Sequence, residues 1–148
     1  MTTPEHRFAI PVTGSASRAA RMMTTVHLAC AAAFGIVVAL YFGRMWFEGA
    51  DRAAMLAMQH DPEGIVPFGL HGLNPFTWLY GAIALLFLLG PFLSPALLAV
   101  SVPVLVFGRQ ALSRPAANWL IAAAVTAVVL PVLRLSPLGA DVTTWWID

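Results

Sequence analysis

An apolar run from Phe76 to Phe107 constrains this chain more than any other feature of its sequence. The run contains no charged side chain, and one helix over its whole length would be about 48 Å long. The hydrocarbon core of a bilayer is only about 30 Å thick, so a straight helix of this length exceeds a single crossing. The run therefore predicts a membrane-embedded helical segment that is longer than one span requires.

The segment GPFLSP, at 90–95, indicates where such a run would divide. Gly90 followed by Pro91 is typical of a helix end, since glycine accepts the left-handed cap and proline cannot continue the hydrogen-bond ladder. Ser94 followed by Pro95 is typical of a helix start. The pattern favours a hairpin of two spans, and a single bent crossing is the alternative.

Two further runs have the length of a span. The first, 24–43, ends at Arg44, and the last, 116–134, ends at Arg134. We therefore predict an all-α, polytopic integral membrane protein with four transmembrane helices. The predicted parts are an N-terminal tail 1–22, a membrane domain 23–136 with spans at about 24–43, 75–90, 95–112 and 116–134, a loop 44–74 and a C-terminal tail 137–148.

The composition agrees with a bilayer environment. Hydrophobic residues make up 59% of the chain and charged residues 10%, whereas a soluble domain carries about 25% charged residues. A net charge of +1 provides no basic field for nucleic acid. The single cysteine, Cys30, excludes an intramolecular disulfide and a CxxC site. Every cationic side chain is arginine, which we interpret as a bacterial coding bias and hence a bacterial plasma membrane.

Arginine positions give a weaker indication of orientation. Three arginines precede the first span, which favours a cytoplasmic N-terminus. Four crossings divide the arginines equally between the two sides, whereas a single bent crossing would move Arg109 and Arg114 to the N-terminal side. Tryptophan placement favours four crossings, which would put Trp46, Trp78 and Trp119 at one interface and Trp145 with Trp146 at the other.

Small residues predict which helix faces meet. Ala31, Gly35 and Ala39 recur every four residues on the first span, and Ala123 and Ala127 do so on the last. Such spacing lets helix backbones approach closely in a membrane. We expect both stripes to be helix contacts, and chance in an alanine-rich sequence is the alternative.

Candidate metal ligands gather in the loop, namely His60, Asp61, Glu63 and His71. Imidazole and carboxylate groups suit a divalent metal, but this spacing matches no metal motif. We therefore predict no metal site and take solvated loop polarity as the ordinary interpretation.

His27 and His71 are the candidates for cofactor binding. A histidine one turn inside a span is a functional hypothesis in its own right. A haem held by two histidines would need both at similar depth, and the four-span arrangement puts His27 and His71 near opposite faces. We therefore expect no cofactor, and a His27 that is hydrogen-bonded near the interface or to a neighbouring helix.

No catalytic motif is present: the sequence has no phosphate-binding loop, HExxH or nucleophile elbow, and no carboxylate within a span. We expect a non-catalytic accessory or assembly subunit that meets a protein partner or further copies of itself in the lipid bilayer. The alternatives are a membrane-embedded enzyme or redox subunit with a site in 48–80, and a small transporter or channel.

Overall fold

The computed structural model describes residues 13–57 and 61–147, and every regular element within these ranges is helical. The elements are α1 Thr13–Glu48, α2 Arg52–Leu56, the 3-10 turn η1 Pro62–Ile65, α3 Pro75–Phe107, the 3-10 turn η2 Arg109–Ala111, α4 Arg114–Leu135 and α5 Pro137–Ile147.

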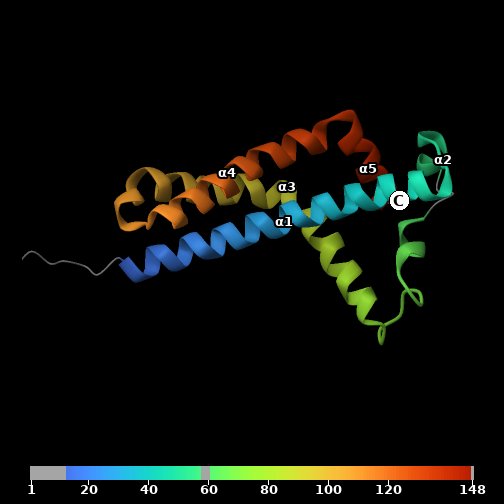
Figure 1. Cartoon of the computed structure of the whole chain (residues 1–148), viewed down its shortest axis with the longest axis horizontal. Coiled ribbons are helices and arrows are strands. Elements are labelled where there is room, and N and C mark those ends of the chain that lie inside the picture. The colour runs from blue at the N-terminus through green and yellow to red at the C-terminus, as the bar shows by residue number, and fades with distance from the viewer. Residues whose placement is uncertain (1–12, 58–60, 148) are drawn as a thin grey trace, which may run out of the picture.

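Helices α1, α3 and α4 form a bundle in which α3 runs against the direction of the other two (Figure 1). Ser101 of α3 lies against Met23 of α1, with 3.7 Å between hydroxyl oxygen and sulfur. All three helices are long and apolar enough to cross a membrane. The prediction of an all-helical membrane protein is supported at this level, and the fourth span is not confirmed.

The predicted helix break at 90–95 was wrong. Helix α3 is continuous over 33 residues, with Pro91 and Pro95 inside it. It bends instead: its first part leaves the bundle obliquely, and its second part lies beside α1 and α4 (Figure 1). Because its first part is oblique, α3 can contain the whole apolar run, which is too long for one straight crossing.

Local hydrogen bonds explain why the helix bends without ending. Pro91 has no N–H to donate to the carbonyl of Phe87, four residues earlier. The guanidinium of Arg134, from α4, donates to that carbonyl instead. The hydroxyl of Ser94, which was predicted to start a new helix, donates back to the carbonyl of Gly90 at 2.8 Å, so it is satisfied within the continuous helix and caps no new one. An apolar environment penalises unpaired backbone groups, so the bond from Arg134 favours a bent helix over a turn.

The C-terminal tail predicted at 137–148 contains α5, which folds back onto the bundle. Trp145 and Trp146 are buried in a core with Tyr41 of α1 and Phe87 of α3. The ring centroids of Tyr41 and Trp145 are 5.4 Å apart, and those of Phe87 and Trp146 are 6.2 Å apart. These tryptophans are therefore core residues and not the interface anchors that the sequence suggested.

The predicted tryptophan layers were wrong in a second respect. Trp119 lies beside Ala20 and Arg21, near the start of α1, whereas Trp46 lies near the end of α1. The two indoles thus occupy opposite ends of the bundle. This separation removes the aromatic argument for four crossings.

One of the two small-residue stripes is a contact within the chain. Ala123 and Ala127 of α4 are buried, as predicted. Gly35 and Ala39 of α1 are exposed, and nothing would meet a Cβ placed at Gly35. The side of α1 that packs inside the bundle instead carries Cys30, Ala33, Val37 and Tyr41.

Candidate functional site

His27 is buried on α1, where it meets the bundle. Its Nδ1 lies 2.8 Å from the carbonyl oxygen of Met23. A carbonyl can only accept, so Nδ1 carries a proton, and in the neutral imidazole Nε2 is an acceptor. Nε2 is buried and has no hydrogen-bond partner in the described part of the chain. His27 is therefore hydrogen-bonded to a carbonyl of its own helix and not to a neighbouring helix.

The structure does not bring His27 and His71 together. His27 lies one turn from Met23, which touches Ser101 near the far end of α3. His71 is exposed and precedes Pro75, where α3 begins. Its backbone N–H donates to the hydroxyl of Thr77 at 3.1 Å. Most of the length of α3 thus separates the two imidazoles.

Among the candidate metal ligands of the loop, Asp61 has a structural role. Asp61 accepts the backbone N–H of Glu63 at 2.7 Å and so caps η1. Glu63 and His71 are exposed. Among the described residues no group of three or more possible metal ligands comes together, and His60 lies outside those residues.

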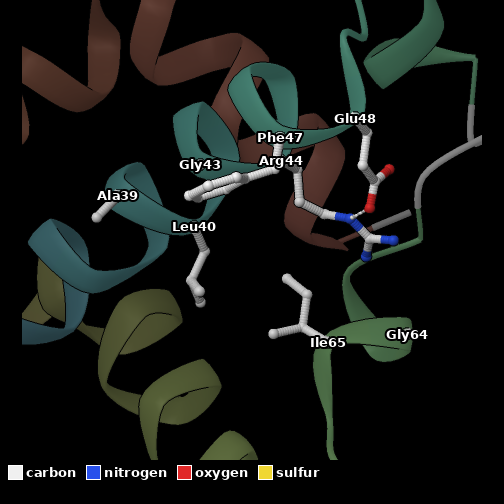
Figure 2. Close-up of a pocket in the computed structure, with 8 residues that line it drawn as sticks. All are labelled: Ala39, Leu40, Gly43, Arg44, Phe47, Glu48, Gly64 and Ile65. Carbon is white, nitrogen blue, oxygen red and sulfur yellow. Dashed lines mark hydrogen bonds and ion pairs between the residues drawn. The ribbon is translucent and has the colours of Figure 1, made fainter.

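An open groove lies between the last part of α1 and η1, with a volume of about 400 Å³ (Figure 2). Leu40 of α1 and Ile65 of η1 extend toward each other across it (Figure 2). The side chain of Phe47 lies along α1 beside Gly43 (Figure 2). The lining is mostly apolar, so the groove suits an apolar segment better than a polar substrate.

Arg44 forms the polar end of this groove. Its Nε donates to Glu48 at 2.7 Å, and its Nη1 donates to the carbonyl of Asp61 at 2.8 Å. The second bond ties η1 to α1 across the loop. This residue therefore fixes the width of the groove. The groove was not predicted from the sequence, although the spacing of Arg44 and Glu48 by four residues indicated the ion pair at its end.

The exposed small-residue face of α1 is continuous with the groove. Ala39 and Gly43 belong to both, and Gly35 extends the face by one turn. A Cβ added at Gly35 or Gly43 would meet nothing within 4 Å. The chain thus leaves open a strip along which another helix backbone could approach closely.

A second fixed point joins α2 to α5 near the same end of the bundle. Arg52 donates two hydrogen bonds to the carboxylate of Asp141, at 2.6 and 2.7 Å. The hydrogen bonds from Arg52 hold the pKa of Asp141 below its ordinary value. The same carboxylate raises the pKa of Arg52. Met55 of α2 is fully buried in the core, so the pair and the core together dock α2.

Charge is distributed unequally between the two ends of the bundle. Ala20 packs against Leu112 and Ala117, which brings the start of α1 to the start of α4. In the described ranges, the charged residues of this end are Arg18, Arg21, Arg109 and Arg114. The acidic residues of the described ranges all belong to the other end: Glu48, Asp51, Asp61, Glu63 and Asp141.

Comparisons of the chain with models of known protein families, with curated proteins and with solved structures found no match.

Proposed function

We propose that this protein is a non-catalytic accessory or assembly subunit of a larger membrane complex. Its binding site is the groove between α1 and η1 together with the exposed face of α1. The occupant is a transmembrane helix of another protein. A non-catalytic role accords with Asp61 and Arg44, whose polar atoms are engaged in holding the loop.

The observation that carries the proposal is the open strip on α1. Gly35, Ala39 and Gly43 are spaced by four residues, and their side of the helix is not used by α3 or α4. Lipid tails gain little by covering such a strip, whereas a partner helix gains close backbone packing there. The neighbouring groove would accept larger side chains of that helix.

We further propose that the chain crosses a bacterial plasma membrane three times, with a cytoplasmic N-terminus. The continuous α3 supports three crossings over the four that the sequence favoured. The end of the bundle whose described charged residues are all arginines supports the orientation, because cytoplasmic segments are enriched in cationic residues. In this arrangement the groove and α2 lie on the external side.

The proposal predicts that leucine at Gly35 and Ala39 releases the partner. Both positions face outward, so the two side chains obstruct a neighbouring helix without disturbing the chain's own packing. The tagged chain is purified from native membranes in mild detergent, and its companion chains and total mass are measured. Wild type is expected to run far above the mass of one chain in a micelle, and the double variant close to it.

Ala122→Leu is the matched control, because Ala122 is an exposed alanine on α4. It should retain every companion chain that wild type retains. The proposal is contradicted if wild type purifies as a single copy, or if the double variant keeps all companions. An assembly of identical chains that Gly35→Leu disrupts would instead identify a second copy as the occupant.

A further inference from the structure

Arg134 occupies an unusual place for a cationic residue. It lies near the end of α4, half-buried, and faces the bend of α3. Its guanidinium carbon lies 4.3 Å above the centre of the Phe87 ring, and its Nη1 donates to the Phe87 carbonyl. Arginines near the ends of membrane helices ordinarily extend outward to the headgroups. Here the side chain turns toward the protein.

The charge of Arg134 is not neutralised within the described part of the chain. Its one hydrogen bond there goes to an uncharged carbonyl, and the ion pairs there involve other residues. The described carboxylate on α5, Asp141, is engaged by Arg52. A guanidinium has five N–H donors, so most of them remain for a ligand. An unpaired cation beside apolar surface is costly unless an anion compensates it.

A groove of about 500 Å³ opens next to this guanidinium. Pro91 and Pro131 form part of its apolar wall, and Thr143 and Thr144 of α5 add hydroxyl groups. The hydroxyl of Thr143 donates to the carbonyl of Gly139 at 2.7 Å, which leaves its oxygen to accept. Cationic, hydroxyl and apolar surfaces thus meet in one groove.

The depth of Arg134 in the bundle indicates what meets this groove. Arg134 follows Arg114, the first residue of α4, by 20 positions, which corresponds to about 30 Å along the helix. That is also about the thickness of the hydrocarbon core. If Arg114 lies at one headgroup layer, Arg134 lies at the boundary of the other, where lipid phosphates meet acyl chains.

We propose that Arg134 and the groove beside it bind an anionic phospholipid. The guanidinium holds the phosphate, and one acyl chain lies along Pro91 and Pro131. Charge complementarity selects a lipid with net negative charge over a zwitterionic one. A bidentate pairing of guanidinium and phosphate also adds geometric specificity. The ligand would hold the bend of α3 and the end of α4 together.

The test measures lipid binding by the full chain in detergent, with native mass spectrometry and thermal unfolding. The probes are phosphatidylglycerol, phosphatidylcholine and inorganic phosphate. Wild type should retain phosphatidylglycerol preferentially and unfold at a higher temperature with it. Arg134→Gln should bind it about 10-fold more weakly or worse, as expected for loss of a charged hydrogen bond. Arg134→Lys should retain part of the binding, because it keeps the charge.

Arg114→Gln is the control, since it removes an exposed arginine at the other end of the same helix. It should bind phosphatidylglycerol as wild type does. Unchanged binding by Arg134→Gln would overturn the proposal, and so would equal retention of phosphatidylcholine by wild type. Equal stabilisation by inorganic phosphate would assign the site to a soluble anion instead. The wild-type comparisons decide the matter even where Arg134→Gln does not fold.

Discussion

His27 presents one satisfied and one unsatisfied nitrogen in a buried position. Nδ1–H donates to the Met23 carbonyl, and Nε2 has no partner in the described part of the chain. An unpaired buried acceptor costs about 1–3 kcal/mol. His27→Leu should therefore leave the stability of the detergent-solubilised chain unchanged or raise it by about 1 kcal/mol.

Thermal or denaturant unfolding measures this effect, with His71→Ala as the exposed control. The control should lie within about 0.5 kcal/mol of wild type, as surface substitutions do. A loss of more than about 2 kcal/mol in His27→Leu would show that a ligand or partner engages Nε2.

The pair between Arg52 and Asp141 makes the docking of α2 dependent on pH. Because Arg52 lowers the pKa of Asp141, the folded chain holds this carboxylate ionised at lower pH than the unfolded chain does. The stabilisation is complete above the ordinary carboxyl pKa and is lost as the pH falls through the lower, folded-state value. Asp141→Asn should therefore melt below wild type at neutral pH, and the difference should vanish as the pH falls below the folded-state pKa of Asp141. A difference that persists undiminished in acid would contradict this account.

Single polar residues were the most predictable part of the fold. Asn74 followed by Pro75 is a helix-start pattern visible in the sequence, and the Asn74 side-chain oxygen accepts the Phe76 N–H at 3.0 Å. Its amide also donates to the carbonyls of Pro67 and Gly69, which no local pattern indicated. A cap acts over a few residues and is visible in sequence, whereas loop contacts depend on where the chain returns.

Among the elements, α4 offers the clearest test of packing. Ala123 is fully buried where α4 meets the bundle, whereas Ala122, one residue before it, is exposed. Ala123→Leu should destabilise the chain by about 1–3 kcal/mol, because an extra side chain forces the helices apart. Ala122→Leu should have little effect. Equal unfolding temperatures for the two variants in detergent would contradict the placement of this face.

The predicted helix boundary at 90–95 was wrong because freed backbone groups are satisfied differently in a membrane bundle and in water. Glycine, proline and serine at 90–95 end and start helices in water, where freed backbone groups meet solvent. Within the bundle, Arg134 donates to the Phe87 carbonyl that Pro91 leaves without a backbone donor, and α3 continues. Arg134 lies 47 positions after Phe87 in the sequence, so the residues around 90–95 gave no indication of this hydrogen bond.

Helix α5 was missed for a related reason. Its tryptophans were read as membrane anchors because they follow the last apolar run. Their burial depends on Tyr41, Tyr80 and Phe87, which come from two other helices. Ring contacts with other helices therefore bury the tryptophans of α5, although the composition of this segment alone favoured a place at the membrane interface.

Among the described residues, the charged groups at one end of the bundle are all arginines, and the other end holds all the acidic groups. The cationic end brings together the start of α1 and the turn between α3 and α4. The other end carries the groove, the loop and α5. The continuous α3 produces this separation of charge, whereas a hairpin at 90–95 would transfer Arg109 and Arg114 to the acidic side.

Labelling of single cysteines in intact cells tests the three crossings most directly. Gln110→Cys and Gly69→Cys, each in a Cys30→Ala background, are treated with a membrane-impermeant thiol reagent before and after permeabilisation. Three crossings predict that the two positions react on opposite sides, with Gly69→Cys labelled from outside. Labelling of both positions from the same side would restore the fourth span and contradict the single bent crossing of α3.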